Sequence, residues 1–86
     1  MEGRIRVVLV DDHTIVRAGL KVLLNLEPDM EVIGEAGTGA EGVERVRALR
    51  PDVVVMDLEM PEMSGLDATR EILAAGVDTR ILVLTS

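Results

Sequence analysis

The sequence of 86 residues contains no phenylalanine, tyrosine, tryptophan or cysteine. Without aromatic rings the chain offers no platform on which nucleic acid bases could stack, so its core must be aliphatic. Without cysteine it forms neither a disulfide nor a thiolate metal site. Basic residues are also few: nine Lys and Arg stand against sixteen Asp and Glu, a net charge of −7. That charge argues against direct binding of this chain to nucleic acid or to an anionic membrane.

Long apolar runs are absent as well. No segment approaches the length of a membrane span, and no apolar stretch of a secretory signal follows the N-terminus. We therefore expect a soluble, cytoplasmic protein with no membrane partner. The length permits one small domain, and no internal repeat or linker divides it.

Apolar residues alternate between strand-like runs and helix-like spacing. The β-branched runs predict buried parallel strands, and the segments with apolar residues three or four apart predict the helices between them. The predicted strands are 5–10, 30–36, 52–56 and 80–86, and the predicted helices are 13–26, 40–49 and 65–75. This order predicts an α/β fold with a parallel sheet and right-handed crossovers.

Local signals refine the predicted helices. Asp12 is placed to cap the first helix, and Gly76 to end the third. The side chains expected to face the core are Val16, Leu20, Leu23 and Leu24 in the first helix, Ala40, Val43, Val46 and Leu49 in the second, and Leu66, Thr69, Ile72 and Leu73 in the third.

Oxygen-bearing side chains follow three of the predicted strands. Asp11 and Asp12 follow the first, Asp57 follows the third, and Thr85 and Ser86 end the fourth. Parallel α/β sheets bind ligands beyond the carboxyl ends of their strands. If these strands are neighbours, three carboxylates converge and repel each other unless a cation is present. An all-oxygen cluster suits Mg²⁺, so we interpret Asp57 as part of a metal site and not as a buried charge.

Each of these residues also has a simpler interpretation. Asp11 or Asp12 alone suits a helix cap, and a single Asp after a strand is a common turn former. His13 is expected on the surface at the start of the first helix. Only the convergence of all the acids on one edge of the sheet favours the metal site.

Three segments together carry a family resemblance. "VLVDDH", "VVVMDLEMPEMSG" and "ILVLTS", in this order and spacing, resemble the receiver domain of two-component response regulators. The segment "DDHTIVRAGLKVLL" is most similar to the subgroup whose receivers precede a LuxR-type helix-turn-helix output domain. The resemblance spans the whole chain and implies a flavodoxin-like (CheY-like) doubly wound sheet with strand order 2-1-3-4-5.

The resemblance also implies roles for individual residues. Asp57 would be the phosphoacceptor, and Asp12, Asp57 and, mainly through water, Asp11 would bind Mg²⁺. The backbone carbonyl of Glu59 would complete the protein ligands of the metal. Thr85 would be the switch hydroxyl and Ser86 would govern access, while Pro61 and Gly65 would shape the loop after the phosphoacceptor.

One feature of the family has no counterpart in the 86 residues. Receivers carry a lysine at the end of a fifth strand, whereas the only lysine here, Lys21, falls on the first predicted helix. Residues 1–86 thus correspond to a receiver domain through its fourth strand, without the last helix, strand and helix and without an output domain. An apolar edge at 81–84 lacking its neighbouring strand is a template for association, so we expect a homodimer, an aggregate or part of a longer chain.

The resemblance implies a regulatory domain and not an enzyme. Its partners would be a sensor histidine kinase or a small phosphodonor, with DNA bound only through an output domain. Two other functions stay open at this point. One is a receiver-like interaction module that is not phosphorylated. The other is a phosphatase of the haloacid dehalogenase type, in which an Asp two residues after the nucleophile would be needed, and that position is Glu59.

Overall fold

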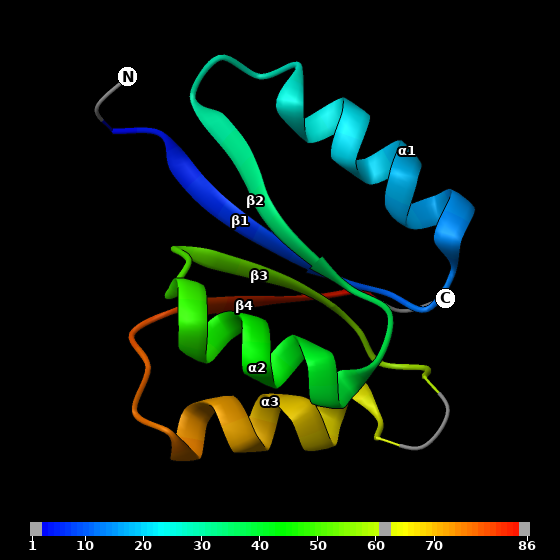
Figure 1. The fold of residues 1–86 in the computed structure, drawn as a ribbon, viewed down its shortest axis with the longest axis vertical. Coiled ribbons are helices and arrows are strands. Elements are labelled where there is room, and N and C mark those ends of the chain that lie inside the picture. Colours follow the sequence, from blue (N-terminus) through cyan, green and yellow to red (C-terminus); the bar gives the residue numbers. More distant parts are fainter. Residues whose placement is uncertain (1–2, 61–62, 85–86) are drawn as a thin grey trace.

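The computed structural model describes residues 3–60 and 63–84, in which strands and helices alternate along the chain (Figure 1). The strands are β1 (Ile5–Val10), β2 (Met30–Ala36), β3 (Val53–Asp57) and β4 (Arg80–Leu84). The helices are α1 (Thr14–Asn25), α2 (Gly39–Leu49) and α3 (Gly65–Ala74). The predicted elements are therefore confirmed in type and order, with ends that differ by at most one residue, and the predicted end of the fourth strand at 85–86 lies outside the described residues. None of the helices in these ranges is long and apolar enough to cross a membrane.

The four strands form one parallel sheet in the order β2-β1-β3-β4. β1 lies between β2 and β3, with Val10 opposite both Ala36 and Met56. β3 in turn pairs with β4, and Asp57 lies opposite Leu84. The strand order and the parallel directions agree with those expected from the sequence, and they bring the carboxyl ends of β1 and β3 side by side.

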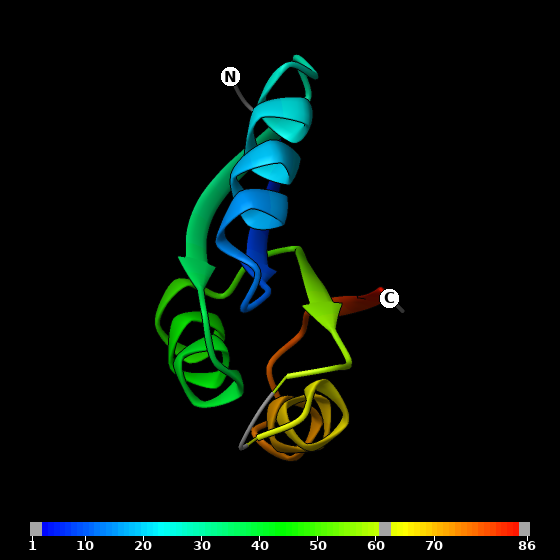
Figure 2. The same cartoon turned by 90° about the vertical axis from the view of Figure 1, so that its right-hand side faces the viewer.

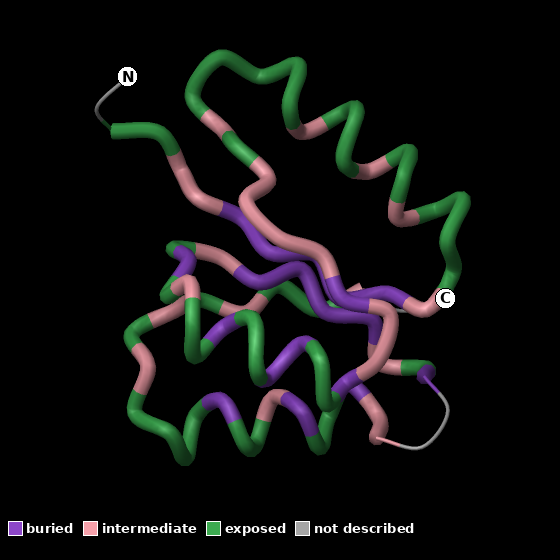
Figure 3. The backbone as a smooth tube through the Cα atoms, in the orientation of Figure 1, coloured by how far each residue is buried: buried purple, intermediate pink, exposed green. Residues whose placement is uncertain are grey.

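Helices cover both faces of the sheet (Figure 2). On one face, α2 and α3 lie side by side against inward-facing residues of β1 and β3, among them Val8, Val10, Val54 and Met56. On the other face, Leu20 and Leu24 of α1 pack against Val7, Leu9 and Val55. Because successive side chains of a strand point to opposite faces, the continuous apolar run of β1 supplies both cores. Figure 3 shows the buried backbone concentrated in these central strands.

The helices bury less apolar surface than their sequence pattern predicts. α1 has no fully buried residue, and Val16 and Leu23 are 50% and 63% exposed. Ala40 of α2 is exposed, and so are Leu66 and Leu73 of α3. The core of α3 is instead formed by Ala68 and Ile72, which lie one turn apart. The inward assignments of Val16, Leu23, Ala40, Leu66 and Leu73 are therefore wrong.

The ends of the helices differ in how they are capped. Thr38 caps α2 and Ser64 caps α3, each hydroxyl accepting a hydrogen bond from the third backbone N–H that follows. α1 begins after His13, which makes no side-chain cap bond. The predicted cap by Asp12 is thus wrong. Gly76 follows α3 with φ +70°, as expected of a residue that ends a helix.

Arg6 of β1 joins the opposite, amino end of the sheet to the end of α2. Its guanidinium donates hydrogen bonds to the carbonyl oxygens of Leu49 and Arg50, at 2.8 and 2.9 Å. Its backbone N–H donates to Asp52 Oδ2 at 2.8 Å. Because the last carbonyls of a helix lack partners within the helix, a cation at this position satisfies them. Arg6 therefore ties β1 to the end of α2 and to the residue before β3.

Candidate functional site

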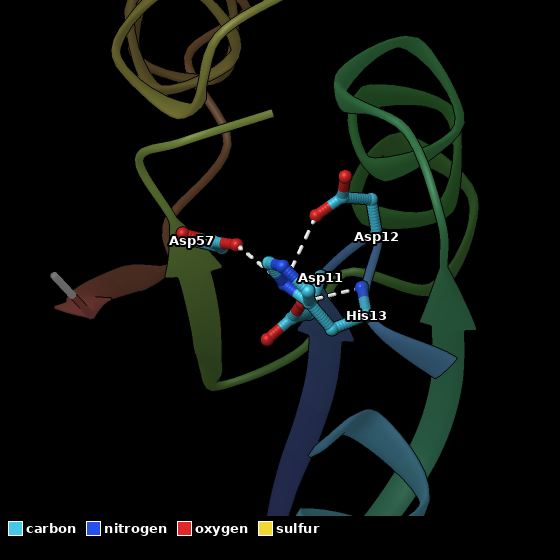
Figure 4. Close-up of side chains that lie close together, drawn as sticks. All are labelled: Asp11, Asp12, His13 and Asp57. Atoms are coloured by element: carbon cyan, nitrogen blue, oxygen red, sulfur yellow. Dashed lines mark hydrogen bonds and ion pairs between the residues drawn. The ribbon is translucent and has the colours of Figure 1, made fainter. Parts of the chain in front are cut away.

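The candidate site lies where β1 and β3 end next to each other. Asp57 is the last residue of β3, and Asp11 and Asp12 directly follow β1 (Figure 4). One carboxylate oxygen of each of these acids and one ring nitrogen of His13 lie within 4.8 Å of one another. The convergence of Asp11, Asp12 and Asp57 that the sequence predicts is thus observed, and it follows directly from the pairing of β1 with β3.

His13 lies at the centre of the three acids. Its Nδ1 lies 2.9 Å from Asp11 Oδ1, 3.2 Å from Asp12 Oδ1 and 3.5 Å from Asp57 Oδ2. The hydrogen bond with Asp11, followed by the negative charge of Asp12, raises the pKa of His13 above its usual 6.5. The imidazole takes the position of a positive charge among three negative ones, and its side chain is still 55% exposed.

Backbone N–H groups orient two of the carboxylates. The N–H of His13 donates to Asp11 Oδ1 at 2.7 Å, and the N–H of Glu59 donates to Asp57 Oδ1 at 3.0 Å. In both cases the Asp side chain accepts from the backbone N–H two residues later, which is a common turn geometry for Asp, and the chain turns directly after the strand. The bond from Glu59 fixes one oxygen of Asp57, and the other oxygen, Oδ2, faces His13.

Asp57 is buried, with 3% of its surface exposed, and Asp11 is buried to a similar extent at 4%. The expectation that Asp57 escapes burial is therefore wrong. The reason is that the strand continues through Asp57, which pairs with Leu84, and that the turn to Glu59 closes over the carboxylate. A buried charge is tolerated where hydrogen bonds and an opposite charge surround it. The Glu59 N–H and the imidazole provide both.

The donors fit a hard divalent cation. Asp12 Oδ1 is buried and accepts no hydrogen bond within the described part of the chain, and its near neighbour is the exposed imidazole of His13, 3.2 Å away. A buried carboxylate oxygen that accepts no hydrogen bond has unused capacity to bind a cation. Three carboxylates and an exposed side that water can reach are the surroundings that Mg²⁺ prefers over Zn²⁺. The residues present therefore fit a magnesium site.

Other residues singled out in the sequence have mixed outcomes. Thr85, Ser86 and Pro61 lie outside the described residues. Gly65 borders the site: its backbone N–H donates to the carbonyl of Leu58 at 3.2 Å, and a Cβ at position 65 would lie 2.0 Å from the carbonyl oxygen of Asp57. Only glycine leaves room for this close approach.

Lys21 lies on α1, where its Nζ pairs with Glu35 at 3.1 Å, and it takes no part in the acid cluster. The predicted place of Lys21 on the first helix is confirmed. His13 is exposed and directly precedes α1, which confirms its predicted place on the surface at the start of this helix. Its contacts with the three acids were not predicted. The signal in the sequence was its position directly after Asp11 and Asp12, from which its ring can lie over the end of β1.

Comparisons with known proteins identify relatives of this chain. Residues 7–86 match the family model described as response regulator receiver domain. The chain is 52% identical over 82 residues to the transcriptional regulatory protein LiaR of Bacillus subtilis. This match covers 95% of this chain and 39% of LiaR. It is 48% identical over 82 residues to the DNA-binding transcriptional activator DevR/DosR of Mycobacterium tuberculosis, covering 95% and 38%. The chain thus spans about two fifths of the length of these relatives.

Solved structures are similar throughout the described fold. The response regulator domain of Thermotoga maritima CheB matches with a TM-score of 0.91 and 41% identity, covering 96% of this chain and 61% of the other. The signal receiver domain of the putative response regulator NarL from Mycobacterium tuberculosis matches with a TM-score of 0.91 and 35% identity. This match covers 95% of this chain and 66% of the other. The flavodoxin-like fold expected from the resemblance is confirmed.

Proposed function

Because this chain belongs to the response regulator receiver domain family, we propose that it accepts a phosphoryl group on Asp57 and thereby acts as a regulatory switch. The observation that carries the proposal is the position of Asp57 at the end of the central strand β3, within a cluster of three acids. A regulatory domain of this kind is not a turnover enzyme. The haloacid dehalogenase alternative loses its basis, because the family match extends over residues 7–86.

Phosphoryl transfer to Asp57 requires that its carboxylate be held in an orientation suited to attack. An oxygen of Asp57 attacks the phosphorus of the donor, the bond from phosphorus to the donor's nitrogen or oxygen breaks, and an acyl phosphate results. The hydrogen bond from Glu59 N–H to Asp57 Oδ1 holds the carboxylate in one orientation. Holding the reacting group in this way lowers the entropy cost of the attack.

Mg²⁺ is the cofactor that the donor set favours. We propose that Asp12 and Asp57 bind it directly, that Asp11 does so mainly through water, and that the backbone carbonyl of Glu59 is a further ligand. When bound, the metal would neutralise the charge of the acids and of the incoming phosphoryl oxygens. His13 Nδ1 now lies among these oxygens, and its exposure leaves the ring free to move to another rotamer. The proposed hydroxyl roles of Thr85 (switch) and Ser86 (access) belong to the same hypothesis.

The partners follow from the relatives. LiaR is described as a transcriptional regulatory protein and DevR/DosR as a DNA-binding transcriptional activator, and this chain matches about two fifths of each. We infer a sensor histidine kinase or a small phosphodonor as the source of phosphate and a cytoplasmic location. Control of transcription would act through a DNA-binding output domain outside the 86 residues, with homodimers as the expected assembly. The lysine of the fifth strand would belong to the rest of the receiver domain, between residue 86 and the output domain.

Phosphorylation in the presence of Mg²⁺ tests the proposal. A chain that continues through the fifth-strand lysine is incubated with a small acyl phosphodonor, and mass spectrometry should find one added phosphoryl group, acid-labile and sensitive to hydroxylamine. In residues 1–86 alone, which lack that lysine, the reaction is expected to be slow or undetectable. Asp57→Asn should abolish the addition. Asp52→Asn is the matched control, because Asp52 precedes the same strand at its opposite end and its oxygen accepts from Arg6. Label persisting in Asp57→Asn would place the acceptor elsewhere. No label in the unmodified protein would favour the interaction module.

A further inference from the structure

Arg17, in the first turns of α1, contacts the backbone of the acid site. Its Nη1 donates a hydrogen bond to the carbonyl oxygen of Asp11 at 2.6 Å, and its side chain is only 20% exposed. A short bond from a partly buried guanidinium is among the stronger hydrogen bonds in proteins. Arg17 therefore contacts the acid site through the backbone of Asp11.

A second acid holds the guanidinium in place. Glu35 of β2 accepts from Arg17 Nε through Oε1 at 3.3 Å, while its Oε2 pairs with Lys21 at 3.1 Å. The network therefore joins α1 to β2 just beside the end of β1. Because both Glu35 oxygens are engaged, Arg17 has one favoured orientation, with Nη1 directed at Asp11.

The Asp11 carbonyl belongs to the peptide unit that leads into Asp12. On the other side of the residue, the Asp11 N–H donates to the carbonyl of Ala36 at 3.0 Å. Since a peptide unit is planar, fixing its carbonyl also fixes the direction in which Asp12 leaves the strand. Arg17 and Ala36 thus hold Asp11 from both sides, and the peptide unit that they fix is the one that leads into Asp12.

Gly37 leaves the room that the guanidinium occupies. A Cβ at position 37 would lie 3.2 Å from Arg17 Nη1, closer than most Cβ contacts in proteins. A methyl group there would press on the guanidinium without touching any of the three acids. This position offers a second and independent way to disturb the same contact.

We propose that Arg17 is a positioning residue for the acid site: by holding the Asp11 carbonyl, it sets the affinity of Asp12 and Asp57 for Mg²⁺. The inference rests on the proposed function insofar as the acids bind this metal. Groups that orient metal ligands from outside typically change metal affinity about 10- to 100-fold when they are removed. The positive charge of arginine repels a cation, so its removal alone would strengthen Mg²⁺ binding. Any weakening on removal of Arg17 therefore reports the loss of the hydrogen bond to the Asp11 carbonyl.

Magnesium titrations followed by backbone amide shifts test the proposal. Arg17→Met should weaken Mg²⁺ binding at least about tenfold and shift the amides of Asp12 and His13 even without metal. Gly37→Ala should change affinity in the same direction, by less. Arg17→Lys keeps the charge but not the planar fork, and we expect it to restore only part of the affinity. Arg47→Met, on the exposed side of α2, is the matched control and should bind like the unmodified protein.

The melting temperature separates positioning from a merely structural role. If Arg17→Met melts earlier but its folded form binds Mg²⁺ as tightly as the unmodified protein, the proposal is overturned. It is also overturned if the unmodified protein binds no Mg²⁺ at these amides. The proposed function is judged separately, by phosphorylation of the unmodified protein, so a protein that binds Mg²⁺ through Arg17's support yet takes no phosphate would refute the function and leave the inference standing.

Discussion

Replacing Gly65 with alanine tests how closely the start of α3 packs against Asp57, the proposed phosphoacceptor. The added Cβ would lie 2.0 Å from the carbonyl oxygen of Asp57 and 2.7 Å from both its carbonyl carbon and the Cα of Leu58. All three atoms are backbone, so no side-chain rotation relieves the overlap. Because Cβ atoms essentially never approach other atoms within 3.0 Å, the start of α3 and the end of β3 must separate by about 1 Å.

The cost of this separation follows from packing. Forcing an extra methyl group into a filled space costs about 3 kcal/mol where only backbone can yield. For a domain of this size, each kcal/mol lowers the melting temperature by about 4–8 °C, so Gly65→Ala should lower it by roughly 12–24 °C. The movement also shifts the Asp57 carboxylate relative to Asp12, so Mg²⁺ binding by the remaining folded protein should weaken.

The matched control is the same substitution at Gly19. This glycine lies inside α1, and a Cβ there would meet nothing within 4 Å. Alanine in an exposed helix interior is favoured over glycine by about 0.8 kcal/mol, so Gly19→Ala should raise the melting temperature by about 3–6 °C. Thermal melts followed by circular dichroism compare the two. If Gly65→Ala melts within about 3 °C of the unmodified protein, the loop before α3 yields more easily than the contact distances imply, and the reasoning fails.

Two further predictions concern opposite ends of the sheet. Arg6→Met removes both hydrogen bonds to the end of α2 and should lower the free energy of unfolding by about 2 kcal/mol, seen as a lower urea midpoint with unchanged slope; an unchanged midpoint would mean that water replaces the guanidinium at no cost. The metal-free pKa of His13, followed by its ring proton resonances, should lie above 6.5 and fall in Asp11→Asn. Because folding raises the pKa of His13, protonated His13 stabilises the fold fully below its unfolded pKa of about 6.5, and this stabilisation is lost as pH rises through the folded pKa. A free energy of unfolding that rises with pH across this window would contradict the contact of His13 with the acids.

The fold was predictable because its signals are local and repeated. The run Val7–Val10 is apolar at every position, which only a strand buried on both faces requires, and the segments after it show helical spacing ended by Gly76 or Pro51. The helix faces were less predictable. Leu66 and Leu73 match the helical period as well as Ala68 and Ile72 do, but α3 is rotated so that small Ala68 meets the sheet.

The sequence predicted which acids form the site, but not the contacts of His13 or the burial of Asp57. The positions of Asp11, Asp12 and Asp57 follow from strand ends, which the sequence indicates directly. The location of His13 among them depends on a side-chain rotamer, and the burial of Asp57 depends on a turn closed by Glu59 N–H. The cap assigned to Asp12 was wrong for a similar reason, because His13 N–H bonds to Asp11 and the helix begins one residue later.

The pairing of β1 with β3 also governs the order in which the acid cluster can assemble during folding. Asp11 and Asp57 lie about half the chain apart, and only this pairing brings them together. The unit of β1, α1 and β2 is more local and closes a shorter loop, so its entropy cost is lower. A chain that has folded only this far carries Asp11, Asp12 and His13 without their partner. The cluster therefore forms no earlier than the pairing of β1 with β3. A divalent cation that binds the complete cluster would stabilise chains with this pairing relative to folding intermediates without it.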